Sequence, residues 1–349
     1  NRTQPHAVTV KRLPTILLLL LAASAVRAEN VGLIADSVVA GRENYDNWQR
    51  AITRGRTVTV PKGDIYLDPK GDGPLSTPAR VSCGRVEVPS AGGYAVKPNP
   101  FTGQMATRII WQDDGPFLRI RGSGFVWDGQ AEIIGRGKAA CVEVEGRSNP
   151  ATGRHQINGP HFRNWAVAIR ALGGYYERGK FIADENHADN SLAENCETWN
   201  CGVFHSLNQQ AQNWLFRRWI INQEGEPSTV VAFDIERGGL ITAEHIVSCV
   251  PLLTVFRVKD YSPNNCYLRL RDFEFDRFPC KSQLTLFEYA GPQFEFNPGF
   301  DMGYIKWRVR ADGWIAPNDQ LEFKRVSVPE FMQQKAKPID TSDVVWEGK

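Results

Sequence analysis

The stretch T-V-F-R-V-K, residues 254–259, is one of four short β-like runs in the second half of the chain that each carry a phenylalanine. The others are G-V-F-H-S-L (202–207), V-A-F-D-I-E (231–236) and T-L-F-E-Y-A (285–290), so the phenylalanine recurs at intervals of 29, 23 and 31 residues. Units of this size cannot each bury an apolar face alone, and they therefore stack on one another. The recurrence predicts an all-β repeat fold, a solenoid of stacked coils with loops of variable length.

The segments around these runs alternate apolar and polar residues, as strands with one buried face do. The clearest example is L-R-L-R-D-F-E-F, residues 268–275. Paired strands of this kind are predicted from Phe117 to Val328, with shorter strands between Arg80 and Val88. No Asn-Gly or Asp-Gly turn separates the members of a pair, which argues against the hairpins of a meander or a sandwich. We therefore expect equivalent strands of successive coils to pair in parallel.

The start of the folded region carries a helix signal followed by two short strands. Residues 46–52, D-N-W-Q-R-A-I, predict one or two helical turns with an Asx cap. Residues 57–67, T-V-T-V-P-K-G-D-I-Y-L, predict a strand, a Pro-x-Gly turn and a second strand. This element resembles the entry to right-handed parallel β-helices of the pectin-lyase-like superfamily, in which a short helix caps the open end. The matching positions are Val58, Val60, Pro61, Gly63, Tyr66 and Leu67.

The resemblance implies an all-β fold, a single-stranded right-handed parallel β-helix over residues 29–328 with a short N-terminal capping helix. Residues 329–349 are expected to cover the last coil as a C-terminal tail or cap, because an open β-helix end is an exposed edge. Residues 127–130, W-D-G-Q, resemble an Asp-Gly-x-Gly turn of polygalacturonase-like β-helices. The catalytic motifs of polygalacturonases and classical pectate lyases are absent, so no specific family is matched and no catalytic residue is transferred.

Residues 1–28 are expected to be upstream residues followed by a secretory signal peptide. Lys11 and Arg12 supply its basic region, residues 13–26 its apolar region and residues 26–28 the cleavage site. The net charge of +2 argues against a nucleic-acid partner. No later stretch has the roughly 18 apolar residues that a membrane span needs. We expect a secreted protein, periplasmic or extracellular, whose oligomeric state the sequence leaves open.

The seven cysteines are an odd number, so at least one of them has no intrachain partner. Cys196 and Cys201 are near enough in sequence to bridge a turn. Cys196 and Cys249 fall on coils that are not adjacent, which is too far apart for a bond. We expect mostly small core residues, with Cys196–Cys201 as the one candidate bridge.

Each of the four phenylalanines is followed by a polar residue that is expected to point outward. Side chains at equivalent positions of successive coils lie about 4.8 Å apart, so these residues form an outward column. Glu236 and Lys259, two residues further along their strands, start a second column, and Glu145 is expected to extend the columns toward the N-terminus. The first column consists of Arg170, His205, Asp234, Arg257 and Glu288.

These charges are the ones that an acidic-polysaccharide site needs. Cations neutralise the uronate carboxylate, a base removes the neighbouring proton and an acid assists the leaving oxygen. In a lyase, His205, Lys259 or an arginine is the base, while Arg170 or Arg257 binds the carboxylate. In a hydrolase, Asp234 and Glu236 act as the paired carboxylates, about 7 Å apart on one strand. The sequence does not distinguish the lyase mechanism from the hydrolase mechanism. Glu288 is a further candidate for substrate binding.

Two loops are expected to flank the column and to wall a groove between them. Residues 173–190 are predicted to be a long connection without regular structure, which overhangs the column and offers Tyr175 and Tyr176 as sugar-stacking platforms. Residues 291–304 carry three phenylalanines at the other end of the groove. Three carboxylates of the first loop are candidate Ca²⁺ ligands, with solvated loop charges as the simpler interpretation. They are Asp184, Glu185 and Asp189.

The leading hypothesis is an exported carbohydrate-active β-helix protein that cleaves a polysaccharide by lyase or hydrolase chemistry. No cofactor is expected, except Ca²⁺ if the loop carboxylates bind it. The alternative is a non-catalytic cell-surface or carbohydrate-binding β-helix protein. In that case the columns are solvated ion pairs between neighbouring strands, worth about 0.2–1 kcal/mol each.

Overall fold

The computed structural model describes residues 31–89, 105–184, 188–208, 211, 213–236 and 239–259, and the backbone of three further strands at 266–275, 283–289 and 309–310. The expected signal segment, the second loop at 291–304 and the tail at 329–349 lie outside these residues. In the described part, no helix is both long and apolar enough to cross a bilayer.

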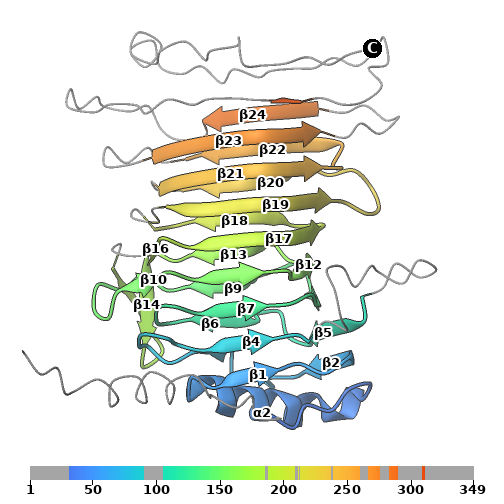
Figure 1. Ribbon diagram of the computed structural model, residues 1–349, viewed down its shortest axis with the longest axis vertical. Helices are drawn as coiled ribbons and strands as arrows, with labels where there is room; N and C mark the ends of the chain where they lie inside the picture. The colour runs from blue at the N-terminus through green and yellow to red at the C-terminus, as the bar shows by residue number, and fades with distance from the viewer. Residues whose placement is uncertain are drawn as a thin grey trace, which may run out of the picture.

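The described chain forms stacked layers of short strands, closed at the N-terminal end by a helix (Figure 1). A 3-10 turn, η1 (Val38–Ala40), leads into α2 (Gly41–Thr53), and strands follow. The first three layers contain three strands each. They are β1 (Thr57–Thr59), β2 (Gly63–Leu67) and β3 (Leu75–Ser76); β4 (Arg85–Glu87), β5 (Thr107–Trp111) and β6 (Leu118–Ile120); and β7 (Val126–Asp128), β8 (Glu132–Ile134) and β9 (Ala140–Val144).

In the later layers the first two strands merge into one longer strand. β17 pairs with both β11 and β12 of the layer before it. The two halves of the merged strands meet at one residue with a left-handed φ: Asn195, Arg218 or His245. The later strands are β10 (Thr152–Gly153), β11 (Gln156–Asn158), β12 (His161–Arg163), β13 (Val167–Ala171), β16 (Ala188–Asp189), β17 (Leu192–Trp199), β18 (Gly202–Ser206), β19 (Trp214–Asn222), β20 (Val230–Ile235), β21 (Gly239–Ser248), β22 (Leu252–Val258), β23 (Cys266–Phe275), β24 (Gln283–Tyr289) and β25 (Val309–Arg310).

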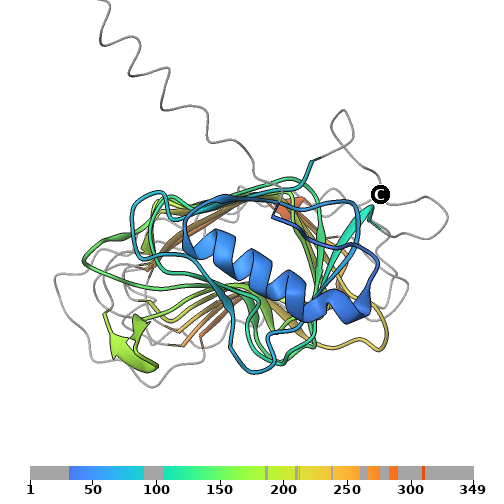
Figure 2. The same ribbon diagram turned by 90° about the horizontal axis from the view of Figure 1, so that it is seen from below.

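Equivalent strands of successive layers form two large sheets. One has 13 strands and includes β1, β4, β7, β11 and the merged strands, and the other has eight strands in the order β24-β22-β20-β18-β13-β9-β6-β3. Every pairing within these two sheets in the described part is parallel, as for β18 with β20 and for β20 with β22. Figure 2 shows the sheets end-on, with α2 lying across the end of the stack. The prediction of an all-β fold with parallel strand pairing is confirmed.

The four phenylalanines lie in register across the eight-stranded sheet, as predicted. Phe204 pairs with Phe233, Phe233 with Phe256, and Phe256 with Phe287. The rings of the first three are fully buried. The ring centroids of Phe233 and Phe256 are 5.1 Å apart, and Phe216 from the opposite sheet lies 5.2 Å from Phe233. The core is therefore a continuous aromatic stack between the two sheets.

The capping helix is longer than the sequence predicted, and the Asx cap is wrong. Its N-cap position is Ala40, without a side-chain hydrogen bond, and Asp46 lies inside the helix, paired with Arg42 at 2.8 Å. The helix buries Trp48 and Ile52 completely. The indole of Trp48 meets the ring of Phe117 edge-on at 5.6 Å, so α2 covers the apolar end of the stack.

Cys196 and Cys201 are both free thiols, so the candidate bridge between them is not formed. The two sulfurs donate to different carbonyls, Cys196 Sγ to Glu194 O at 3.1 Å and Cys201 Sγ to Phe162 O at 3.5 Å. Both side chains are buried, and burial raises the pKa of Cys201 to about 12. The expectation that the cysteines serve as small core residues holds for this pair.

His155 is a fully buried histidine at a corner of the stack. Its Nδ1 accepts a hydrogen bond from the backbone N of Phe125 at 3.3 Å, and its Nε2 has no hydrogen-bond partner in the described part of the chain. Burial disfavours the charged imidazolium and lowers the pKa of His155 from 6.5 to about 3. The folded state therefore keeps this side chain neutral where the unfolded chain binds a proton.

We expect His155 to make the protein less stable in acid. Because the folded-state pKa lies below the unfolded one, its contribution is complete above pH 6.5 and is lost as the pH falls toward 3. Between pH 6.5 and about 4.5 the loss is about 2 kcal/mol, somewhat less than two full units at 1.36 kcal/mol per unit, because the unfolded histidine is already half protonated at pH 6.5. Urea unfolding of the wild type and of His155→Phe at both pH values measures it. The expectation fails if the variant keeps the full acid dependence.

Candidate functional site

The predicted outward column lies on the eight-stranded sheet. The register pairs Arg170 of β13 with His205 of β18, His205 with Asp234 of β20, and Asp234 with Arg257 of β22. Backbone pairing places Glu288 of β24 next to Arg257. The column is therefore present in the predicted order, because Arg170, His205, Asp234 and Arg257 each directly follow a buried core residue.

Two charged residues that the sequence analysis missed extend the column toward the N-terminus. Arg119 of β6 pairs with Glu143 of β9, and Glu143 pairs with Arg170. Glu145, the predicted member, lies two residues further along and is fully buried in a different cluster. The signal for Glu143 is present in the alternation V-E-V at 142–144, where both valines face the core.

His205 is held between an arginine and a carboxylate. Arg170 Nε donates to His205 Nδ1 at 3.2 Å, so the ring hydrogen lies on Nε2, which is 3.1 Å from Glu236 Oε1. Burial lowers the pKa of His205, and the Arg170 charge lowers it further, while Asp234 and Glu236 oppose the shift. The imidazole is therefore neutral near pH 7, the state that a general base requires.

The two predicted catalytic carboxylates are both neutralised by cations. Arg257 Nη2 lies 2.5 Å from Asp234 Oδ2, and Lys259 Nζ lies 2.9 Å from Glu236 Oε1 and 3.4 Å from Asp234 Oδ2. Burial alone would raise the pKa of each carboxyl group, but the hydrogen bonds from Arg257, Lys259 and His205 outweigh it. Both pKa values lie below the ordinary range. Neither group is protonated at neutral pH, so neither is suited to act as a general acid.

Arg170 is the least compensated of the column's cations. Among the described residues, its one ion pair, apart from the bond to His205, is Nη1 to Glu143 Oε1 at 3.8 Å. Glu143 is occupied by Arg119, whose Nε and Nη2 donate to its Oε2 at 3.1 and 2.8 Å. The guanidinium of Arg170 therefore has donors left for an anionic ligand, and its geometry suits a carboxylate.

A cleft of about 580 Å³ opens over the column. Arg170, His205, Asp234 and Arg257 line it on the sheet side. Its other side is the connection between β19 and β20, which contributes residues 223, 224, 226, 228 and 229. The groove predicted between residues 173–190 and 291–304 depends on a loop outside the described residues. The wall formed by the β19–β20 connection was not predicted, because its sequence is that of an ordinary polar turn.

The wall is fixed to the stack through Glu224. The backbone N of Glu224 donates to Asn200 Oδ1 at 2.7 Å, and its carboxylate lies 2.6 Å from Arg163 Nη1. The neighbouring Glu226 is exposed and lines the cleft. The cleft is therefore preformed, with its cations on the sheet side and carboxylates on the wall.

The predicted irregular loop at 173–190 contains an antiparallel hairpin, β14 (Gly174–Glu177) with β15 (Lys180–Ala183). Tyr176 contacts Arg119, whose guanidinium lies 4.0 Å from the ring centroid, and Tyr175 contacts Arg147 at 3.8 Å. Neither tyrosine lines the cleft. The predicted sugar platforms therefore lie beside the layers of β6 and β9, on the N-terminal side of Arg170, and each has one face covered by an arginine.

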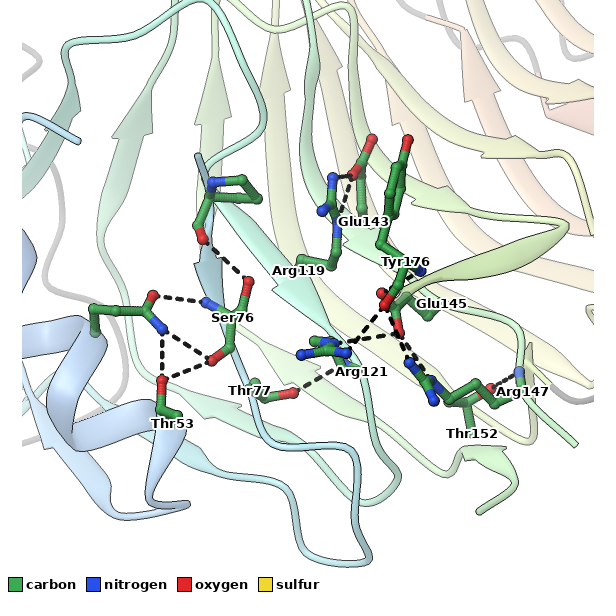
Figure 3. Close-up of polar contacts among 12 residues, drawn as sticks. Thr53, Ser76, Thr77, Arg119, Arg121, Glu143, Glu145, Arg147, Thr152 and Tyr176 are labelled. Atoms are coloured by element: carbon green, nitrogen blue, oxygen red, sulfur yellow. Dashed lines mark hydrogen bonds and ion pairs between the residues drawn. The ribbon is translucent and has the colours of Figure 1, made fainter. Parts of the chain in front are cut away.

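The hairpin is attached to a buried charge cluster (Figure 3). Glu145, with no exposed side-chain surface, accepts from the backbone N of Tyr176 at 3.0 Å and from Arg147 Nε at 3.0 Å, and lies 3.6 Å from Arg121 Nε. The carbonyl of Tyr176 accepts from Arg121 at 3.1 Å and from Arg147 at 3.4 Å. The backbone of one hairpin residue, Tyr176, thus contacts the carboxylate through its N–H and both guanidinium groups through its carbonyl.

We expect Glu145→Ala to destabilise the protein by about 3 kcal/mol, the low end for breaking a buried ion pair, because Arg121 still reaches solvent. The hairpin should also lose its protection from hydrogen exchange, since the backbone N of Tyr176 loses its acceptor. Urea unfolding and hydrogen exchange at residues 174–183 measure the two effects. Glu177→Ala, an exposed carboxylate on the same hairpin, is the control. Unchanged hairpin protection in Glu145→Ala would contradict this role.

The candidate Ca²⁺ ligands are dispersed in the described part of the chain. Asp184 accepts hydrogen bonds from the backbone N and the hydroxyl of Ser148, both at 2.8 Å. Asp189 lies in β16, which pairs with β10, and Glu185 is outside the described residues. Among described residues, no group of three or more His, Cys, Asp or Glu side chains is placed to hold a metal ion. Ca²⁺ binding stays a prediction.

Comparison of the chain with protein-family models, with curated proteins and with solved structures found no significant match. The function of the chain is therefore inferred from the residues of the cleft itself.

Proposed function

We propose that the chain is a secreted right-handed parallel β-helix of the pectin-lyase-like type. The parallel pairing of equivalent strands in successive layers supports this, as does the helix that covers the first layer. The wide face of such a stack presents residues of many layers to one extended ligand, which suits a polymer.

We propose that the cleft binds an anionic polysaccharide and cleaves it by β-elimination. The observation that carries the proposal is the Arg170–His205 pair in the cleft, where an incompletely paired guanidinium contacts a neutral imidazole. A uronate carboxylate bound to Arg170 takes over its donors, which releases the lone pair of His205 Nδ1. Carboxylate recognition and activation of the base are then one event.

The elimination follows from this arrangement. His205 Nδ1 takes the proton from the carbon next to the bound carboxylate, and the electron pair forms a carbon–carbon double bond as the glycosidic carbon–oxygen bond on the adjacent carbon breaks. Glu236, which accepts from Nε2, stabilises the imidazolium. Arg170 stabilises the negative charge that develops on the carboxylate. The departing oxygen takes a proton, for which we assign the Lys259 ammonium.

Hydrolysis receives less support from the same site. It requires one carboxyl group that stays protonated until it donates to the leaving oxygen. Asp234 and Glu236 both have lowered pKa values, because Arg257 and Lys259 hold them ionised. Elimination needs no protonated carboxyl group, and we therefore favour a lyase.

A binding protein without catalysis is the second candidate. The observation that favours it is the mutual neutralisation of Asp234 with Arg257 and of Glu236 with Lys259, which a purely structural ion-pair column also produces. Such a protein would retain anionic polysaccharides through Arg170 without cleaving them.

Screening the purified protein against uronate and neutral polysaccharides tests the proposal. Ultraviolet absorbance follows the unsaturated product, and a reducing-end assay follows every break. We expect both signals to rise together on at least one uronate polymer and on no neutral one. Reducing ends without ultraviolet absorbance would indicate hydrolysis, and binding without either signal would leave the binding protein ahead.

A further inference from the structure

The tip of the β14–β15 hairpin combines two cations with an exposed aromatic ring. Residues 177–181 are all exposed, and the exposed fraction of Phe181 is 49%. The turn is tight, because Arg178 and Gly179 both adopt positive φ, of 47° and 77°. This is the backbone of a two-residue hairpin turn, whose twist matches that of its strands.

The two cations of the tip are not neutralised by carboxylates of the described part of the chain. Among the described residues, neither Arg178 nor Lys180 forms an ion pair, although Glu177 is the cross-strand neighbour of Lys180. The column differs in this respect, since its arginines and Lys259 all contact carboxylates. The tip thus has one net positive charge in full contact with solvent.

The hairpin is held in place well enough to present this tip. Its root is bound to Glu145 through the backbone N–H of Tyr176, and to Arg121 and Arg147 through the carbonyl of Tyr176. The ring of Phe181 meets the ring of Tyr176 edge-on with centroids 5.2 Å apart. A rigid aromatic ring loses little conformational freedom when a ligand packs on it, so the tip is preorganised for binding.

We propose that Arg178, Lys180 and Phe181 form a second binding site for an anionic polysaccharide, and that this site holds a distant stretch of the same polymer that occupies the cleft. The identity of the ligand rests on the proposed function. The cations pair with carboxylate or sulfate groups, and the phenylalanine packs against the apolar face of a sugar ring.

The position of the hairpin supports a connection between the two sites. The chain enters it four residues after Arg170, and it lies over Arg119, which belongs to the same column as Arg170. Figure 1 shows the hairpin strand β14 beside the layers of β6 and β9, on the N-terminal side of β13, so a polymer that extends from Arg170 along these layers would pass the hairpin. Two linked contacts on one chain raise its affinity through the effective concentration of the second contact.

The test compares a long polymer with a short oligosaccharide of the same uronate. The variant Arg178→Gln/Lys180→Gln/Phe181→Ser is expected to raise the ratio of polymer KM to oligosaccharide KM about tenfold, since the linked contact is lost. The control is Arg54→Gln/Lys62→Gln, two exposed cations near α2 whose removal changes the net charge equally. An unchanged ratio in the hairpin variant, or an equal change in the control, would overturn the proposal.

Retention of the same polymers in affinity electrophoresis separates this proposal from the proposed function, because it requires no cleavage. If the wild type binds a uronate polymer without cleaving it, weaker retention of the hairpin variant still supports the second site. If Arg170→Ala abolishes cleavage while the hairpin variant is retained like the wild type, the lyase proposal stands and the second site is overturned.

Discussion

Replacing His205 with alanine is expected to lower kcat for cleavage of a uronate polymer by about 10²–10⁴-fold, the usual contribution of a general base. The imidazole is the one group of the described cleft that is neutral, contacts the carboxylate-binding Arg170 and has a carboxylate behind it to stabilise its charged form. Initial rates, measured as ultraviolet absorbance of the unsaturated product, give the loss directly.

The chain contains a matched control for this substitution. His161 also pairs with a glutamate, Glu197 Oε2 at 3.0 Å, but on the 13-stranded sheet and outside the cleft. His161→Ala removes the same chemical groups and is expected to leave kcat within about twofold, because the residue touches no substrate. Wild-type activity in His205→Ala would move the base elsewhere, and equal losses in both variants would indicate a structural effect.

Replacing Phe233 with alanine is expected to destabilise the protein by about 3–5 kcal/mol, the range for removing a buried aromatic ring. Its ring is fully buried and lies 5.1 Å from Phe256 and 5.2 Å from Phe216, so its removal leaves a cavity between two layers and between both sheets. Because each layer contacts its neighbours, the loss propagates along the stack. Urea unfolding gives the change in free energy.

Phe181→Ala is the matched control for the core substitution. This ring is 49% exposed at the hairpin tip, and its loss is expected to change stability by about 0.5 kcal/mol or less. A loss below about 1 kcal/mol in Phe233→Ala would mean that the aromatic stack is not the main source of stability, in conflict with its burial.

The parts of the fold that follow from local alternation were predictable from the sequence. A strand with one buried face fixes which residues point inward, and a one-residue shift would expose the whole apolar set. The phenylalanine at the third position of each run therefore specified the register from Phe204 to Phe287, and with it the polar residue that follows each one. The same reasoning, applied to Val142 and Val144, identifies Glu143.

The loops and the corner contacts were not predictable, because tertiary contacts determine their paths. The wall of the cleft depends on Glu224 meeting Arg163 and Asn200, which are about 61 and 24 positions away in the chain. Residues 174–183 form a hairpin whose Tyr176 backbone is bound by Glu145, Arg121 and Arg147. No periodicity in the sequence encodes such pairings, and the same holds for the cysteines, whose proximity in sequence did not place their sulfurs together.

Cleavage of a uronate polymer in isotopically labelled water is the most direct test of elimination by Arg170 and His205. Elimination breaks the glycosidic bond without adding water, so mass spectrometry should show products with an unsaturated end and no labelled oxygen from the cleavage step. Hydrolysis adds one water per break. Saturated products that each carry one labelled oxygen would contradict the account.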